Sequence, residues 1–411
     1  MHVVIVNRWP RFSDGVRWDN ELTRYEEFVD HRRHTVSYVV DGPGAQGVLA
    51  PPELVAHQVH VADVNDVEAL RAAVAEIVRA VGPVDQLVAM SEFTLEVAAR
   101  VREDLGIPGP TVADVAPYRD KVRMKEILDE AGVRVPRFST CPGVDTVLAF
   151  AADVGYPVIV KPVDGAASIG VHRVDDESAL RALLPGVDLG RYEVEEFVTG
   201  TIHHVDGYVD VAGDVPFQVV SRYVNDCLAF GGGAPLGSVV VQRSVLRDRI
   251  EDFTRDVVRH LGMHATPFHL ELFVRPDSEL VFLEIGGRVG GSEVPHLLNR
   301  LFGVNLFEIW LRTLTGEPVD VPVKDHDGSG GWLVVPKPDA TVRVERVSSM
   351  AARVPIVWRE LLPQPGDVLE PGGAYDALHS GRFILLDDEE ATVEAGIRQI
   401  VAEFELEASP A

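Results

Sequence analysis

The stretch FHLELFVRPDSELVFLEIGGR, residues 268–288, decides the fold prediction because it combines a hairpin pattern with two opposed glutamates. Two runs that alternate like β-strands flank a turn rich in Pro, Asp and Ser. A loop symmetric about its central Asp-Ser pair places Arg275 opposite Leu280. Counting back along both strands then puts Glu271 directly opposite Glu284.

Two carboxylates held in this way need a cation. Cβ atoms of directly paired residues lie roughly 5 Å apart, where like charges destabilise a sheet. Such a pair either raises one pKa or binds a metal, and its oxygen ligands suit Mg²⁺. The alternative is a hairpin with Glu271 and Glu284 on a solvent face, since charged residues are mostly exposed. We expect His269, Phe273 and Phe282 on the same face, which favours a site.

Composition limits the classes of partner. The 411 residues suffice for two or three domains with ample core. The net charge of −26 argues against nucleic acid or an anionic membrane as the main partner, and favours small polar substrates. The first residues show no signal-peptide pattern, and no segment approaches the ~20 apolar residues of a membrane span, which predicts a cytoplasmic protein. Cys141 and Cys227 lie outside any CxxC motif and are predicted to be ordinary buried thiols.

The chain pattern predicts a multidomain protein of mixed α/β and α+β class. Alternating strands and helices in residues 1–115 indicate a parallel α/β layer, without the GxGxxG motif of a dinucleotide fold. A Pro- and Gly-rich stretch marks its end. We expect a compact α+β module at 116–199, a larger unit with the hairpin at 200–316, and a small β-rich appendage at 317–411.

Two lysines and a glycine-bearing loop could bind phosphate. Lys161 lies in the apolar strand PVIVKPV, although such a lysine often extends its ammonium to a strand edge instead. Lys121 begins a helix and could add a second ammonium, or be a solvated helix residue. The loop GAASIG offers backbone N–H groups that an anion can approach closely, at Gly165, Ala167, Ser168, Ile169 and Gly170. It lacks the GxxxxGK[ST] pattern of a P-loop.

Three further features complete the constellation. The strand YEVEEFV, residues 192–198, could present backbone groups to a flat adenine edge. Arg288 follows the hairpin, where its guanidinium could stabilise developing negative charge. His203 and His204 should face opposite sides of a strand, so no metal site is predicted there. Substrate walls could come from residues 227–238 and the segment around His296.

The order of these motifs resembles the ATP-grasp superfamily, and within it the carboxylate-amine ligases similar to L-amino acid (dipeptide) ligases. The resemblance covers the whole chain and rests on Lys121, KPVDGAASIG (161–170), EEFVTG (195–200), HLELF (269–273) and LEIGGR (283–288). It implies an N-terminal parallel α/β domain, a two-lobed ATP-binding core and a small β-rich C-terminal appendage.

The resemblance also implies roles for residues. Lys121 and Lys161 would contact the ATP phosphates, and the loop at 165–170 would close over them. Glu271 and Glu284 would hold Mg²⁺, or Mn²⁺ in its place. Backbone atoms of the hinge would bind adenine, with the cofactor-binding set Glu195, Glu196, Phe197 and Val198.

Arg288 and His269 are the catalytic residues that the resemblance suggests. Arg288 would stabilise the acyl-phosphate and tetrahedral states. His269 could bind substrate or assist amine deprotonation, or be a satisfied core histidine. Ile202 stands where many ATP-grasp enzymes have an acidic ribose ligand, leaving Asp206 or Glu196 as substitutes. Gly286 stands where many have an Asn metal ligand.

The predicted function is ATP-dependent formation of an amide between a small carboxylate and an amine, through an acyl phosphate. The predicted partners are those two small molecules, with no nucleic acid and no membrane, and a homodimer is a further hypothesis. One alternative is an ATP-dependent small-molecule kinase, which would need a single co-substrate. Another is a nucleotide-binding regulator without turnover, against which the retained lysines, glutamates and Arg288 argue.

Overall fold

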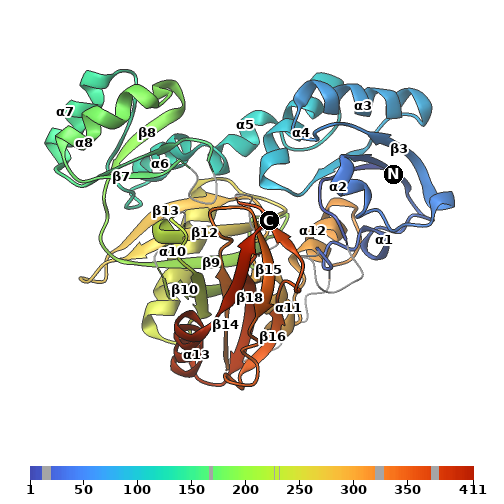
Figure 1. Ribbon diagram of the computed structural model, residues 1–411. Helices are drawn as coiled ribbons and strands as arrows, with labels where there is room; N and C mark the ends of the chain where they lie inside the picture. The colour runs from blue at the N-terminus through green and yellow to red at the C-terminus, as the bar shows by residue number, and fades with distance from the viewer. Residues whose placement is uncertain (12–19, 166–169, 226, 231, 320–327, 372–378) are drawn as a thin grey trace.

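A computed structural model describes residues 1–11, 20–165, 170–225, 227–230, 232–319, 328–371 and 379–411. Two smaller units, the N-terminal layer and a small lobe, lie beside one another above a larger body (Figure 1). The mixed α/β and α+β class predicted from the sequence is confirmed. Within the described ranges, no helix has the length and apolar character needed to cross a membrane.

The N-terminal layer is a four-stranded parallel sheet of order β3-β2-β1-β4. All six residues of β1 are buried, as expected where helices cover a parallel sheet on both faces. Its strands are β1 (His2–Asn7), β2 (Thr35–Val40), β3 (Val55–His60) and β4 (Gln86–Ala89). Its helical elements are α1 (Tyr25–Phe28), α2 (Gly42–Ala45), η1 (Pro52–Leu54), α3 (Val67–Ala80) and α4 (Glu92–Leu105).

The small lobe is an antiparallel sheet of order β5-β8-β6-β7, reached through a helical connection. Asp120 caps the N-terminus of α6 with its carboxylate, which fixes where Lys121 starts that helix. The strands are β5 (Phe138–Thr140), β6 (Val158–Pro162), β7 (His172–Val174) and β8 (Tyr192–Glu196). The helical elements are α5 (Val112–Val115), η2 (Ala116–Tyr118), α6 (Lys121–Glu130), α7 (Val144–Val154), α8 (Glu177–Leu183), η3 (Leu184–Gly186) and η4 (Leu189–Arg191).

The body is built on an eight-stranded antiparallel sheet of order β13-β12-β9-β10-β11-β14-β18-β16. Its strands are β9 (Thr201–Val209), β10 (Phe217–Tyr223), β11 (Leu236–Val240), β12 (Thr266–Val274), β13 (Leu280–Gly286), β14 (Ser329–Val335), β16 (Val357–Leu361) and β18 (Gly381–Asp387). Its helices are α9 (Cys227–Phe230), α10 (Val245–His260), α11 (Val294–Phe302), α12 (Leu306–Leu314) and α13 (Glu390–Glu403).

The C-terminal strands divide between two sheets. Strands β14, β18 and β16 continue the eight-stranded sheet by pairing from β11 outward. A separate three-stranded sheet of order β17-β15-β19 holds β15 (Val342–Val347), β17 (Val368–Leu369) and β19 (Leu406–Pro410). The expected β-rich C-terminal segment is therefore in part a continuation of the main sheet of the body. The four domain boundaries drawn from the sequence stay predictions.

Continuous apolar cores join the units. One core runs from Val3 and Tyr25 of the N-terminal layer to Phe307 in α12 and Trp332 in β14. A second joins Leu128 of α6 to the strands and the helix α10 of the body. Apolar packing of this extent holds neighbouring units in a fixed relation, and side chains at their seams can form sites.

The hairpin places Glu271 opposite Glu284, as predicted, but by a different register. Near the turn Val274, not Arg275, lies opposite Leu280, so the predicted symmetric loop is wrong. A β-bulge between the pairs Leu272–Phe282 and Glu271–Glu284 adds one residue to β13 and restores the predicted pairing.

The bulge also changes which side chains accompany the glutamates. Phe282 is fully buried in the core of the body, so the prediction that it shares the glutamate face is wrong. Leu283, the extra residue in β13, lines a cavity together with Phe273, Glu271 and Glu284.

Candidate functional site

Two cavities meet at the hairpin glutamates. Glu271, Glu284 and Cys227 line both of them. The lysine-lined cavity lies between the small lobe and the body and includes Lys121 and Lys161. The aromatic-lined cavity lies between the N-terminal layer and the body. Cys227 is half-buried at their junction, so its prediction as an ordinary buried thiol is wrong, whereas Cys141 is buried.

Most predicted nucleotide-binding residues come together in the lysine-lined cavity, and their roles stay predictions. Gly170 has a left-handed backbone (φ 73°), and a side chain there would collide with Tyr192 and Pro162. Ala167, Ser168 and Ile169 lie outside the described residues. The predicted residues that line the cavity are Lys121, Lys161, Gly165, Glu195, Glu196, Phe197 and Val198.

Lys121 connects the loop to a glutamate of the hairpin. Its ammonium donates a hydrogen bond to the carbonyl oxygen of Gly165. The same nitrogen lies 3.1 Å from Oε2 of Glu284. The side chain is buried rather than solvated, so the alternative of an exposed helix residue is wrong.

Lys161 belongs to a buried group of four ionisable side chains that was not predicted from the sequence. The group consists of Lys125, Lys161, Glu193 and Glu195. Its Nζ lies 2.7 Å from Oε1 of Glu195. Lys125 is fully buried, and its Nζ donates to Oε2 of Glu193 at 2.6 Å and to Oε2 of Glu195 at 2.8 Å. Two lysines thus face two glutamates inside the small lobe, since buried charged groups require partners, and burial raises the pKa of Glu193.

The pKa values of this group reflect competing effects. Burial alone would raise the pKa of the Glu195 carboxyl, but Lys125 and Lys161 lower it to about 2. Burial disfavours the charged form of Lys161, yet Glu195 and Glu193 raise its pKa above the ordinary value. Lys161 therefore stays positively charged at neutral pH, as a side chain that binds phosphate should be.

A sequence signal for this group did exist. Lys125 stands four residues after Lys121, on the same face of a helix. Glu193 and Glu195 alternate within a short strand, so both point to one side of the sheet. Two lysines on one face of a helix and two glutamates on one face of a strand have opposite charges, so the two faces could have been predicted to pack together.

The hinge strand presents its last residues to the lysine-lined cavity. Glu196 accepts from Nη2 of Arg134 at 2.5 Å and from the backbone N–H of Arg137 at 2.9 Å. The guanidinium of Arg173 lies over the ring of Phe197, 4.6 Å from its centroid. These contacts order the segment that was predicted to bind adenine.

Asp206 is excluded as a substitute ribose ligand. It is 1 % exposed and does not line the lysine-lined cavity. Its two oxygens accept hydrogen bonds from His204 Nδ1 at 2.7 Å and from His269 Nδ1 at 2.8 Å. Glu196, which lines the cavity, remains the predicted substitute for an acid at Ile202.

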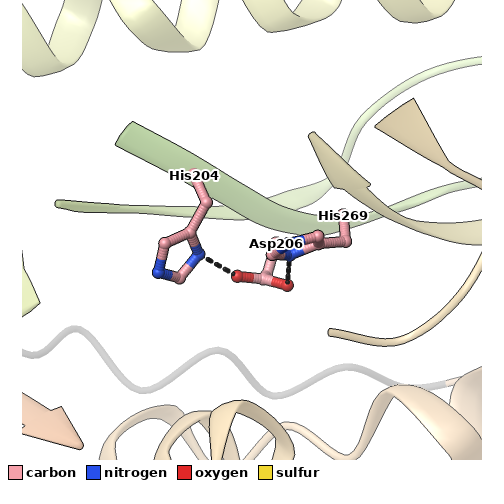
Figure 2. Close-up of side chains that lie close together, drawn as sticks. All are labelled: His204, Asp206 and His269. Carbon is pink, nitrogen blue, oxygen red and sulfur yellow. Dashed lines mark hydrogen bonds and ion pairs between the residues drawn. The ribbon is translucent and has the colours of Figure 1, made fainter. Parts of the chain in front are cut away.

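Figure 2 shows the Asp206 carboxylate between the two imidazole rings. The three side chains offer ligand atoms within 4.8 Å of one another, a spacing that could suit a metal ion. However, each Nδ1 already donates to Asp206, and Nε2 of His204 lies 2.7 Å from Oγ of Ser238. The contacts describe a hydrogen-bonded relay, and the absence of a metal at His203 and His204 stays a prediction.

The relay continues to Glu271, which was predicted to bind a metal ion. Nε2 of His269 lies 3.4 Å from Oε1 of Glu271, which also accepts from the Tyr223 hydroxyl at 2.7 Å. Burial alone would lower the pKa of His269, but Asp206 raises it to about 9. Both ring nitrogens face carboxylates, which favours a positioning role for His269 over the predicted role as a base for the amine.

The donor set of Glu271 and Glu284 fits Mg²⁺. Burial alone would raise the pKa of Glu271, but His269 and Tyr223 lower it to about 2, so the carboxylate is charged. The hydrogen bonds that Glu271 accepts from the protein involve its Oε1, and Lys121 contacts Oε2 of Glu284. Within the described ranges, the other oxygen of each carboxylate has no protein hydrogen-bond donor and stays available for a cation.

Arg288 is held by a glutamate of the N-terminal layer. Its Nε donates to Oε2 of Glu92 at 2.8 Å, and Arg119 donates to Oε1 of Glu92 at 3.0 Å. Burial alone would raise the pKa of Glu92, but Arg288 and Arg119 lower it to about 2. The guanidinium lines the aromatic-lined cavity beside Glu271 and Glu284.

Glu92 is a second functional residue that sequence reasoning missed. It lies at the start of α4, shortly after the end of β4, and the carboxyl ends of parallel strands are where such folds bind ligands.

The packing of the loop after Arg288 explains one of its glycines. A side chain at Gly290 would collide with Oδ1 of Asp206, so only glycine lets this loop pass the relay.

The two-lobed core, the parallel N-terminal layer and the cavities between them agree with the ATP-grasp architecture predicted from the sequence motifs. Residues 154–296 match the family model described as the ATP-grasp domain. The resemblance noted from the sequence motifs is therefore confirmed.

The chain is also similar to particular proteins, one by sequence and two by fold. The chain is similar to the L-arginine-specific L-amino acid ligase of Bacillus subtilis, with 26% identity over 333 residues, 76% of this chain and 78% of that protein. Its fold matches an L-amino acid ligase from Bacillus licheniformis with TM-score 0.74 at 19% identity, over 99% of this chain and 98% of the other. It also matches a biotin carboxylase domain of 2-oxoglutarate carboxylase from Hydrogenobacter thermophilus, solved with MgADP, with TM-score 0.69 at 16% identity over 99% and 90%.

Proposed function

We propose that this protein is an ADP-forming ligase that joins a small carboxylate to an amine, with amino acids as the substrate class. One observation carries the proposal: two separate cavities meet at Glu271 and Glu284. One cavity holds the lysines suited to phosphate, and the other holds Arg288. A reaction between ATP and a second small molecule needs this arrangement, with the transferred group passing between the two cavities.

In the first step, a carboxylate oxygen of the acid attacks the γ-phosphorus of ATP. The bond from γ-phosphorus to the bridging oxygen breaks, which gives an acyl phosphate and ADP. Lys121 and Lys161 orient the phosphates and balance their charge, and Arg288 orients the carboxylate.

In the second step, the amine nitrogen attacks the acyl carbon. The amide forms, inorganic phosphate leaves, and the amine gives up a proton. Arg288 stabilises the oxyanion of the tetrahedral state. Because Glu92 fixes the guanidinium at 2.8 Å, little reorganisation is needed as that charge develops.

Glu271 and Glu284 would hold Mg²⁺, with Mn²⁺ as an alternative, and the ion would neutralise charge on the phosphoryl group. The MgADP bound in the biotin carboxylase domain supports this choice of cofactor. Position 286, where many ATP-grasp enzymes carry an Asn ligand, is glycine here, so the two carboxylates act without that third side chain. The ATP requirement supports a cytoplasmic location, and a homodimer stays a hypothesis.

Screening amino acid pairs for phosphate release, with mass detection of the product, tests the proposal. A ligase forms ADP and an amide only when an acid and an amine are both present. A kinase would form ADP and a stable phosphorylated product with one co-substrate. Nucleotide binding without turnover across a broad screen would favour a regulatory protein and contradict the ligase.

A further inference from the structure

The aromatic-lined cavity has an apolar wall opposite its charged end. Trp9 and Phe307 pack edge to face, with ring centroids 5.6 Å apart, and Trp332 lines the same space. Tyr223 meets Trp332 at 6.3 Å and 89°. Four rings from β10, α12, β14 and the segment after β1 therefore surround one volume. Large rigid rings of this kind bind apolar side chains with a small entropic cost.

The acidic groups on the wall of this cavity already have partners. Glu92 binds Arg288 and Arg119, and Glu271 binds Tyr223 and His269. Glu284 pairs with Lys121 and is one of the two proposed metal ligands. Among the described lining residues, no carboxylate remains to bind the charge of a cationic substrate side chain. A side-chain guanidinium or ammonium placed against the apolar wall would be buried without a counter-ion, which is costly, whereas the α-ammonium of an amino acid stays beside its own carboxylate.

Two residues of the same wall each have a buried polar atom without a partner in the described part of the chain. Nδ2 of Asn20 and Oγ of Ser292 have no hydrogen-bond partner there, although their residues are only 8 % and 4 % exposed. Ser292 also adopts a left-handed backbone (φ 55°), which costs energy for a residue other than glycine. Buried polar groups nearly always have partners, so these atoms point to polar groups of a ligand.

We propose that the acid substrate is an α-amino acid with a large apolar or aromatic side chain, and that the aromatic-lined cavity is its binding site. The inference rests on the proposed ligase function. The side chain packs against Trp9, Phe307 and Trp332. Its α-ammonium donates to Oγ of Ser292, and its carboxylate accepts from Nδ2 of Asn20 and from Arg288. In this respect the protein differs from its relative that is specific for L-arginine.

Hydroxylamine in place of the amine isolates the choice of acid, because it converts any acyl phosphate into a hydroxamate. With ATP and Mg²⁺ present, we expect kcat/KM for phenylalanine or leucine to exceed that for arginine by roughly tenfold or more. Preference for arginine, lysine or glutamate would overturn the inference and leave the ligase intact. Hydroxamate from no acid, together with no ADP in the pairwise screen, would instead remove the ligase and the inference with it.

Variants of the wall test the assignment of residues. Trp9→Ala should raise KM for phenylalanine by about tenfold while KM for ATP stays unchanged. Trp9→Glu, which adds an unpaired carboxylate, should shift the preference toward arginine. Trp358→Ala is the matched control, because Trp358 is 45 % exposed and lines neither cavity. Equal kinetics for Trp9→Ala, Trp9→Glu and the parent toward both acids would contradict the assignment, and thermal melts check folding.

Discussion

Arg288 and Glu92 form an ion pair of 2.8 Å that joins the body to the N-terminal layer across 196 residues of sequence. Arg119 binds the other oxygen of Glu92. The guanidinium proposed to act on the acid substrate is thus aimed by a different unit of the chain. The N-terminal layer therefore contributes to the site and is more than a scaffold.

Replacing Glu92 by Gln should loosen Arg288 without removing it. We expect kcat/KM for the acid substrate to fall by about tenfold or more, because misplacement of a positioning group is costly, while KM for ATP stays unchanged. Steady-state kinetics with each substrate varied in turn measures this split. Glu96→Gln, an exposed change on the same helix, should behave like the parent. An equal rise of both KM values would indicate a general structural defect instead.

Glu92 also predicts a pH dependence of stability. Its pKa is lowered from an ordinary 4.5 to about 2, so its contribution is present above pH 4.5 and is lost as pH falls toward 2. The contribution is on the order of 3 kcal/mol. Urea unfolding between about pH 6 and about pH 3 should show a shallower acid loss for Glu92→Gln than for the parent. Identical slopes would contradict the ion pairs drawn around Glu92.

The assignment of Glu284 as a metal ligand predicts a loss of Mg²⁺-dependent activity when this residue is replaced. Glu284→Ala should reduce Mg²⁺-dependent ATP consumption roughly 100-fold, with the fold intact. Calorimetry should show weaker binding of Mg²⁺ in the presence of ADP. Glu279→Ala, in the turn of the same hairpin and paired with Arg275, is the matched control. Undiminished turnover and Mg²⁺ binding in Glu284→Ala would remove the assignment.

The buried charge group of the small lobe predicts a large stability effect. Lys125→Met leaves Glu193 without its 2.6 Å partner and should lower the free energy of unfolding by about 3 kcal/mol. Arg123→Met, on the exposed side of the same helix, should cost less than about 1 kcal/mol. Urea unfolding of the two variants gives the comparison. A small effect for Lys125→Met would mean that the four charges are not held as a unit.

The histidine relay predicts an effect on metal affinity at a distance. Asp206→Asn weakens the hold on His269 and, through it, on Glu271, and should raise the Mg²⁺ concentration needed for half-maximal rate by about tenfold. KM for ATP should change little. His203→Gln alters the neighbouring residue of β9, which is not part of the relay, and should leave the Mg²⁺ requirement unchanged. If both variants shift it equally, the relay has no special role.

Local pattern was enough to predict many of the elements and several of the residues that line the two cavities. The opposition of Glu271 and Glu284 followed from strand periodicity and a turn signal. The counting was correct only because a bulge at Leu283 compensated for a turn that is longer by one residue than predicted, and bulges leave no clear mark in a single sequence. The same bulge explains why Phe282 was placed on the wrong face.

Residues that act through long-range contacts were missed. Glu92 meets Arg288 only because the N-terminal layer packs on the body through a shared apolar core. Lys125 meets Glu193 through the packing of α6 on the small-lobe sheet. Asp206 was one of two possible ribose ligands predicted from the sequence. It shares a face of β9 with His204, and only the fold shows which cavity that face meets.

The acyl-phosphate mechanism is tested most directly by the fate of a carboxylate oxygen. The acid substrate is labelled with oxygen-18 in its carboxylate, and the products formed with ATP and an amine are analysed by mass spectrometry. The proposed ligase transfers one labelled oxygen from the acid to inorganic phosphate and leaves the other in the amide. Amide formation with no label in phosphate would contradict the central claim.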